Sequence, residues 1–226
     1  MTRVHVICEG QTEETFVNEV LFDWFHPRGI YLFPSLIGKP GHKGGNLKFQ
    51  RLLIDIRGRL LGDKAAYCTT FFDFYGLPRD FPGKEDAGIK PSISEKAQCV
   101  VQSLTEQLQS KLGEEPLRRF IPYVQMHEFE GLLFSEPEVL AQGIYQTGLA
   151  VSFREIRDSF NSPEDIDDSP VTAQSKRILR LFPAYDKPVH GSLAALEIGL
   201  AAIRRECALF NRWLERIEAL PTGVTA

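Results

Sequence analysis

Acidic residues follow this chain's apolar runs at three points where a buried strand is expected to end. Glu9 comes after RVHVIC, Asp73 comes after AAYCTTFF, and Glu128 and Glu130 end the segment RFIPYVQMHEFE. Ligands of a parallel sheet bind at the carboxyl ends of its strands, so these carboxylates are expected at one edge. Like charges repel at close range, and a fold that gathers carboxylates without a basic partner usually holds a cation there. The pattern predicts a metal site and leaves the choice between Glu128 and Glu130 open.

Carboxylate oxygens are hard ligands and favour Mg²⁺ or Mn²⁺, and Mg²⁺ keeps several waters for a phosphate substrate. Each acid also has a purely structural explanation. Glu9 can simply end a strand, and Asp73 can form a turn before Tyr75. Glu13 and Glu14, in the stretch EGQTEETF, suit the first turn of a helix because its dipole favours negative charge there.

The elements that would position these acids alternate between strand and helix. Strands are expected in RVHVIC, GIYLFPSLI, AAYCTTFFD and RFIPYVQMHEFE. Helices are expected in TEETFVNEVLFDWF with Thr12 as cap, in NLKFQRLLIDIRGRLL, and in SISEKAQCVVQSLTEQLQSKLG with Ser92 or Ser94 as cap. Residues 75 to 92 look like a loop. This alternation predicts an α/β fold with a mainly parallel sheet flanked by helices.

After about residue 135 the strand signals nearly vanish, and helices are expected over roughly 137–146, 150–160, 171–182 and 191–219. We predict an α/β core over residues 1–135 and a helical C-terminal part over residues 136–226. No repeat or low-complexity linker separates them, so they are expected to form one compact unit.

Composition is that of an ordinary globular protein, with 43% hydrophobic and 25% charged residues and a net charge of −4. No global basic field indicates nucleic acid, so such binding would rest on a local patch or on a partner. The four cysteines are scattered without a CxxC pair, which argues against a zinc site. No apolar run reaches the roughly 20 residues that span a bilayer. We expect a cytoplasmic protein without membrane contact.

The runs EGQTEETFV, FFDFYGLPRDFPG, HEFEGLLF, SPEDIDDSPVTAQSKRI and YDKPVHG resemble an uncharacterised bacterial domain family that is grouped with the Toprim-like proteins. The likeness covers almost the whole chain, and HEFEGLLF is its most specific motif. It implies a Toprim-like, metal-dependent fold found in topoisomerases, primases and nucleases of phage defence. Genes of such nucleases often lie beside an ABC-type or AAA-type ATPase, which would make that ATPase a partner.

Carried over by this resemblance, Glu9 matches a strand-end glutamate that binds metal or acts as a general acid–base. Asp73 matches the first acid of an Asp-x-Asp pair whose second position is Tyr75 here, so one metal ligand of topoisomerases is missing. Glu130 is the substitute that the Phe-Glu motif of defence nucleases implies, and Glu13 matches a further acid of these relatives.

Basic residues in three stretches are candidates for phosphate contacts, which position a nucleic acid without reading its sequence. They are Lys39, His42 and Lys43 in GKPGHKGGN, Lys176 and Arg177 in QSKRI, and Lys187 and His190 in YDKPVHG. Each could equally be a solvated surface charge. The aromatics of FDFYGLPRDFPG either stack on bases or belong to the core.

Three functional hypotheses remain from the sequence. The first is a Mg²⁺- or Mn²⁺-dependent nuclease of DNA or RNA, in which Glu13 or His127 transfers protons and Lys187 stabilises charge on the phosphate. The second is a catalytically weak regulatory partner of an ATPase. It is suggested by Tyr75, which stands in place of the second acid of the Asp-x-Asp pair. The third, an enzyme of small-molecule phosphates, lacks a GxxxxGK[ST] loop. Because the chain is acidic, affinity for nucleic acid is expected to come from the partner or from a homodimer.

Overall fold

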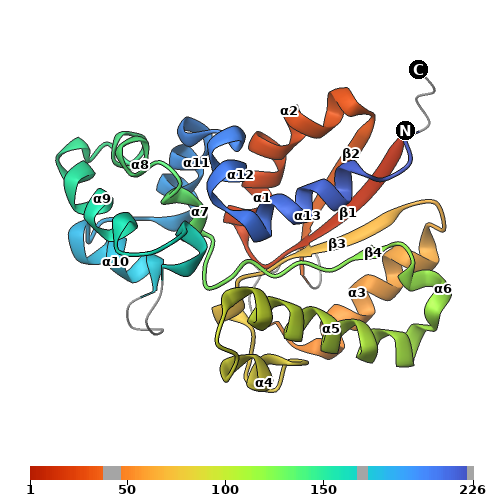
Figure 1. The fold of residues 1–226 in the computed structure, drawn as a ribbon. Helices are drawn as coiled ribbons and strands as arrows, with labels where there is room; N and C mark the ends of the chain where they lie inside the picture. The colour runs from red at the N-terminus through yellow and green to blue at the C-terminus, as the bar shows by residue number, and fades with distance from the viewer. Residues whose placement is uncertain (38–46, 167–172, 223–226) are drawn as a thin grey trace.

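The computed structural model describes residues 1–37, 47–166 and 173–222 and has an all-parallel sheet at its centre. Its strands are β1 (Thr2–Cys8), β2 (Ile30–Leu36), β3 (Tyr67–Phe71) and β4 (Phe120–Ile121), in the order β2-β1-β3-β4 (Figure 1). Helices cover both faces, as is typical of parallel sheets, whose strands must be buried on both sides. The predicted α/β class is confirmed, and the arrangement is consistent with a Toprim-like fold.

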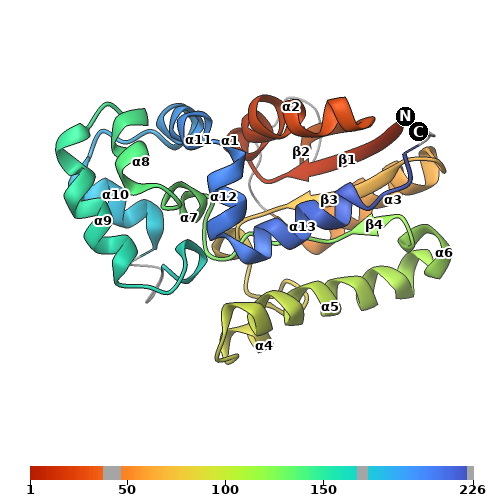
Figure 2. The same cartoon turned by 45° about the horizontal axis from the view of Figure 1, so that its top comes forward.

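Two hydrophobic clusters hold the helices to the two faces. On one face, Phe71 of β3 packs with helices from both ends of the chain: α1 (Gln11–Phe16), η1 (Val17–Leu21), α2 (Phe22–Phe25), α12 (Leu200–Glu206) and α13 (Ala208–Glu218). On the other face, Ile7 and Phe72 pack against α3 (Phe49–Gly62) and α5 (Ile93–Leu112). The two layers are visible above and below the sheet in Figures 1 and 2.

The remaining helices gather beside the carboxyl ends of the strands, at the left of Figures 1 and 2. They are α7 (Glu130–Leu133), α8 (Pro137–Gly143), η4 (Thr147–Leu149), α9 (Ala150–Asp158), η5 (Pro163–Asp165), α10 (Gln174–Leu181), η6 (Lys187–Gly191) and α11 (Ser192–Ile198). One hydrophobic cluster extends from the α/β core into this group. It contains Val4 and Val6 of β1 together with Phe129 and Phe134.

The predicted fourth strand over RFIPYVQMHEFE is mostly wrong. β4 ends at Ile121, where the Tyr123 amide donates to the Thr70 side chain at 3.0 Å, and only an isolated bridge between Asp73 and Gln125 follows. The chain then turns at His127, whose φ is 64°. Glu130 therefore belongs to the first turn of α7 and not to a strand end.

Helix boundaries differ from the predictions in three places. The predicted helix 191–219 is three helices, divided at Gly199, which has a φ of 76°, and at Cys207, which has extended dihedrals. The first helix is capped by Gly10 and not by Thr12, which is the buried second residue of α1. The segment predicted as a loop contains η3 (Phe74–Gly76) and α4 (Lys84–Gly88).

The predicted cap of the helix over residues 93–112 is confirmed. Ser92 caps α5, where it forms a reciprocal capping box with Glu95. Within the described residues no helix has the length and apolar character needed to cross a membrane. Two short elements complete the fold: η2 (His26–Arg28) leads from α2 to β2, and α6 (Glu114–Leu117) leads from α5 to β4.

Candidate active site

The strand order creates one preferred place for a site. β1 and β3 are neighbours, and the sheet grows outward from them in opposite directions, to β2 on one side and β4 on the other. In open parallel sheets a crevice forms outside the carboxyl ends of such a pair. Glu9 follows β1 directly, and Asp73 lies two residues after β3. The predicted meeting of these two acids thus falls on the topological switch point.

Glu9 is fixed by the backbone on the β3 side of the crevice. Its Oε2 accepts a hydrogen bond from the Asp73 amide at 3.0 Å. Gly76 lies so close that a Cβ at this position would stand 2.2 Å from Glu9 Oε1. Only glycine leaves room for the carboxylate there, because carbon and oxygen atoms that are not bonded do not approach to such a distance.

Glu13 reaches the same crevice from the first turn of α1. Its Oε2 accepts the Gly10 amide at 3.0 Å, which satisfies one of the unpaired amides of the helix N-terminus. The side chain is almost fully buried, and its Oε1 has no hydrogen-bond partner in the described structure. Glu14, by contrast, does not belong to the buried residues of α1.

Glu128 and Glu130 have different hydrogen-bond and charge partners. Glu128 Oε2 accepts the Ser175 amide at 2.8 Å and so caps the N-terminus of that helix. Glu130 is fully buried and faces Lys187. Glu130 is therefore the member of the HEFE run that pairs with Lys187, while Glu128 lies close enough to Glu9 to act on it electrostatically.

Lys187 supplies the positive charge at the centre of these acids. Its Nζ lies 2.8 Å from Asp73 Oδ2, 3.3 Å from Glu130 Oε2 and 3.5 Å from Glu13 Oε1. The residue opens η6, a π-helical turn whose cap, Asp186, accepts the Val189 amide at 3.0 Å. Single π-helical turns often occur at functional sites. A residue of the helical C-terminal part is thus paired with acids of the α/β core.

Burial and mutual repulsion shift the ionisation of this cluster. Burial, followed by the charge of Glu13, raises the pKa of Glu9 to about 7 despite the hydrogen bond from the Asp73 amide. Burial likewise raises the pKa of Asp73 and of Glu130, and Lys187 opposes both shifts. Burial alone would lower the pKa of Lys187, but Asp73, Glu130 and Glu13 together raise it well above its ordinary value. Shifts of this kind are common at functional sites.

A cavity of about 330 Å³ opens directly onto the cluster and is lined by residues 9–13, Asp73, Lys187 and Pro188. Asp73 Oδ1 and Glu13 Oε1 are buried and accept no hydrogen bond from the described residues. One ammonium group faces several carboxyl groups, so full ionisation of these acids would leave an excess of negative charge. Carboxylate oxygens that accept no hydrogen bond are the type of ligand that a hard divalent cation such as Mg²⁺ or Mn²⁺ prefers.

The cluster is not a ready-made metal cage. In the part of the chain that the structure describes, no three acidic, histidine or cysteine side chains are grouped to hold a metal ion. Lys187 Nζ occupies the space between Asp73 and Glu130 instead. We therefore expect a bound metal to require a change in the position of the Lys187 ammonium group.

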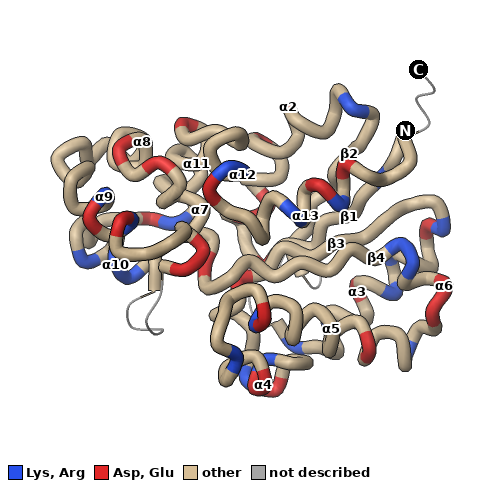
Figure 3. The backbone as a smooth tube through the Cα atoms, viewed as in Figure 1, with Lys and Arg blue, Asp and Glu red and all other residues tan. Residues whose placement is uncertain are grey.

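The other predicted residues lie outside this cluster or outside the described residues. The buried ring of His127 packs against Phe74 and Tyr75, and the His127 carbonyl accepts the Tyr75 amide. His190 accepts the Asp186 amide at its Nδ1. Lys176, which is exposed, and Arg177, which lies over the Phe160 ring, belong to α10, while Lys39, His42 and Lys43 lie outside the described residues. Basic and acidic residues are interspersed along the backbone in Figure 3.

Sequence reasoning missed Tyr185 and Lys84. The Tyr185 hydroxyl is buried, and burial followed by the charge of Glu130 raises its pKa. The motif YDKPVHG contains this tyrosine and could have drawn attention to it. Lys84 donates to the Phe74 carbonyl, and burial lowers its pKa to about 8. Its surroundings looked like a loop in the sequence, so no signal marked it.

A family model described as a domain of unknown function, DUF4276, matches residues 8–218, and the chain belongs to this family. No curated protein matches the sequence. Among solved structures, the C-terminal region of the Burkholderia pseudomallei OLD protein is similar, with 15% identity and a TM-score of 0.44. That alignment covers 96% of this chain and 98% of the other. Neither description states a reaction, so the function has to be argued from the site.

Proposed function

We propose that this member of the DUF4276 family is a Toprim-like nuclease that hydrolyses phosphodiester bonds of DNA or RNA with Mg²⁺ or Mn²⁺. The observation that supports it best is the cluster of buried Glu13, Asp73 and Glu130 around the half-buried Lys187, which lies with Glu9 at the switch point of a parallel sheet. Such a site combines carboxylates for a hard cation with a basic group for a phosphate.

Each residue has a role that follows from its surroundings. Glu9, Asp73 and Glu130 would hold the metal ion, which when bound polarises a phosphoryl oxygen and lowers the pKa of a water molecule. Lys187, once released from Asp73 and Glu130, provides a positive charge for the phosphate as negative charge develops on it. Glu9 is suited to proton transfer because its pKa of about 7 lies near neutral pH. Glu13 Oε1, which accepts no hydrogen bond, is a second acceptor for a proton.

The substrate and the biological setting belong to the proposal. Lys176, Arg177, Lys187 and His190 are candidates for contacts to the phosphates on either side of the cleaved bond. Because the chain has a net charge of −4, we propose that a partner supplies part of the affinity. By the family resemblance, that partner is an ABC-type or AAA-type ATPase, and the process is bacterial defence against phage.

The decisive experiment is a cleavage assay with end-labelled single-stranded DNA, double-stranded DNA and RNA, each with Mg²⁺, Mn²⁺ or EDTA. We expect metal-dependent cleavage by the wild-type chain and its loss in Glu9→Gln, Asp73→Asn and Glu130→Gln. Glu14→Gln is the matched control, because this residue is on the same helix as Glu13 but does not belong to its buried face. Cleavage that persists in all three cluster variants would contradict the proposal.

A catalytically weak partner of an ATPase is the second candidate, and two features favour it. Tyr75 stands where the resemblance implies a second aspartate, and Lys187 Nζ already neutralises part of the cluster. Titration of Mg²⁺ and Mn²⁺ into the wild-type chain by calorimetry separates the two. Absence of metal binding and of cleavage, together with a changed ATPase rate in a copurified partner, would favour this candidate.

A further inference from the structure

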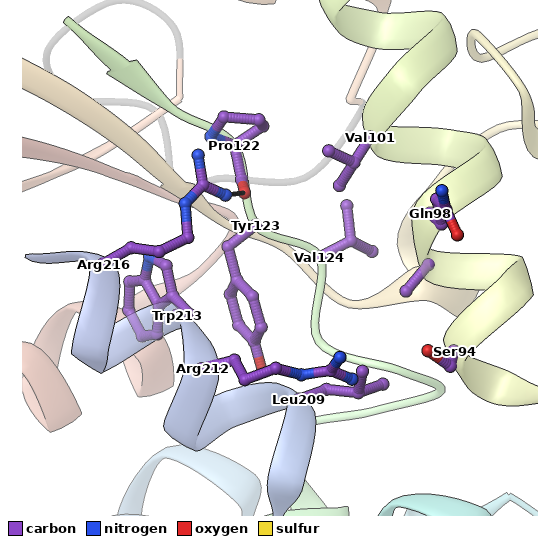
Figure 4. Close-up of a pocket in the computed structure, with 11 residues that line it drawn as sticks. Ser94, Gln98, Val101, Pro122, Tyr123, Val124, Leu209, Arg212, Trp213 and Arg216 are labelled. Carbon is purple, nitrogen blue, oxygen red and sulfur yellow. Dashed lines mark hydrogen bonds between the residues drawn. The ribbon is translucent and has the colours of Figure 1, made fainter.

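Tyr185 is a buried tyrosine whose hydroxyl forms no hydrogen bond with the described residues. Tyr123 provides the contrast. It lines a cavity of about 410 Å³ between α5 and α13, away from the acidic cluster, and its ring stacks on that of Trp213 (Figure 4). Tyr123 is similarly buried, but its hydroxyl donates to the Gln125 side chain. A buried polar group without a partner costs free energy, so the unpaired hydroxyl of Tyr185 needs a physical explanation.

Packing places the Tyr185 hydroxyl beside α1 and α7. A Cβ at Gly191 would lie 3.0 Å from this hydroxyl, and 3.7 Å from both the Phe129 ring and the Thr12 methyl group. Phe129 and Thr12 directly precede the acids that α7 and α1 contribute to the cluster. The Tyr185 ring also stacks on His190, with the ring centroids 5.8 Å apart. The hydroxyl is therefore held at the junction where the acidic cluster forms.

Glu130 is an acceptor at the same junction that lacks hydrogen bonds. Both of its carboxylate oxygens are buried and accept no hydrogen bond from the described part of the chain, although Lys187 Nζ lies 3.3 Å from Oε2. After burial, the charge of Glu130 is the next cause that raises the pKa of Tyr185, so the two side chains lie within electrostatic range. An unpaired donor and an unpaired acceptor are thus neighbours in the interior.

We propose that Tyr185 is a positioning residue for Glu130, and that its hydroxyl donates to the Glu130 carboxylate when Lys187 moves away to make room for a metal ion. The inference rests on the proposed function, which requires this movement, and it names the group that replaces Lys187. Carboxylates that bind metal ions are usually oriented by hydrogen bonds from neighbouring groups. A phenol hydroxyl suits this role because it donates a hydrogen bond without a positive charge that would repel the metal ion.

A double-mutant cycle of Tyr185→Phe and Lys187→Met tests this exchange of partners without metal or substrate. With Lys187 present, we expect Tyr185→Phe to leave the urea midpoint unchanged or to raise it, because the lost hydroxyl is unpaired. In the Lys187→Met chain, we expect the same substitution to lower the folding equilibrium constant about tenfold, because a hydrogen bond to a carboxylate is lost. Tyr145→Phe is the matched control at an exposed tyrosine and should have no effect in either chain.

Calorimetric titration with Mn²⁺ tests the role of Tyr185 in the site. We expect Mn²⁺ to bind the Tyr185→Phe chain at least about tenfold more weakly than the wild-type chain, a loss typical of groups that orient metal ligands. Tyr145→Phe should bind Mn²⁺ as the wild type does. This comparison uses single variants, so it decides the inference even if Lys187→Met does not fold.

Two results would overturn the inference. The first is an equal effect of Tyr185→Phe with and without Lys187, which would show that the hydroxyl does not take over from the ammonium group. The second is Mn²⁺ binding that is unchanged in Tyr185→Phe, which would show that Glu130 needs no such support. If the wild-type chain binds no Mn²⁺, the proposed nuclease function fails, and the double-mutant cycle still decides whether Tyr185 pairs with Glu130.

Discussion

The substitution Lys187→Met tests the electrostatics of the acidic cluster most directly. Methionine has a similar length but no charge, so the change leaves Glu13, Asp73 and Glu130 buried without their common cation. At separations of 2.8 to 3.5 Å, each pair is worth about 5 to 6 kcal/mol at an effective dielectric constant of about 20. The desolvation of the ammonium group offsets much of this attraction. We therefore expect the free energy of unfolding to fall by about 3 to 5 kcal/mol, as for other broken buried pairs.

The loss should depend on pH, and its sign follows from the raised pKa values. Folded Asp73 and Glu130 hold protons above the unfolded value of about 4. A group with a raised folded pKa binds more protons in the native state, so stability falls as pH rises through the interval between the two values. Without Lys187 the pKa values of these acids rise further. The variant should therefore lose less stability at pH 5 than at pH 8, where all the acids tend to ionise.

Urea unfolding of the wild-type and Lys187→Met chains at both pH values measures the effect, with Lys176→Met as an exposed control on α10. Millimolar Mg²⁺ provides a second readout, because a metal that binds the freed carboxylates would restore stability to the variant. A variant that matches wild type at pH 8 would refute the reasoning, since the ammonium would then contribute nothing to the buried acids. Equal losses at pH 5 and pH 8 would refute the raised pKa values.

Three further predictions address the site and the fold. Gly76→Ala should abolish metal-dependent cleavage, because the new Cβ would meet Glu9 Oε1, whereas Gly88→Ala, with open space around it, should cleave as wild type does. Calorimetry should show that Mg²⁺ binds more tightly as pH rises from about 6 to 8, since Glu9 must lose its proton, and this dependence should weaken in Glu9→Gln. Glu164→Ala should lower the free energy of unfolding by about 2 kcal/mol in urea, because its carboxylate accepts the Leu209 and Phe210 amides at the start of α13. An unchanged urea midpoint would contradict this capping role.

The fold class was predictable from the sequence because its signals are local. Apolar runs rich in β-branched residues marked three strands, and helical spacing marked the helices between them. The fourth strand was predicted too long, because the Thr70 side chain that accepts the Tyr123 amide lies 53 positions away in the sequence. The division of the last helix at Gly199 was missed because its apolar period continues across the glycine. Only the backbone, with a φ of 76° at that residue, reveals the break.

The sequence predicted the acidic residues of the site, but it predicted much less well the groups that bind to these acids. Strand ends indicated Glu9 and Asp73, since topology alone brings such positions together. The ion pair of Asp73 with Lys187 joins residues 114 positions apart, and no local pattern encodes a contact of that range. Glu128 and Glu130 were indistinguishable in the sequence, because their partners, the Ser175 amide and the Lys187 ammonium group, are both distant along the chain. The roles of His127, His190, Lys176 and Arg177 remain predictions.

The acidic cluster joins residues of the α/β core to residues of the helices beside it. Glu9, Glu13 and Asp73 come from the core, whereas Lys187 opens η6 and Glu130 opens α7. Aromatic side chains pack at the same junction. The ring centroid of Phe16 lies 5.4 Å from that of Phe129 and 5.9 Å from that of Phe210. Loosening the helical part would therefore separate Lys187 from Asp73 and expose the orphaned carboxylates together. The position of η6 relative to β3 controls how much negative charge the crevice offers to a cation, which makes the docking of the two parts a condition for the proposed chemistry.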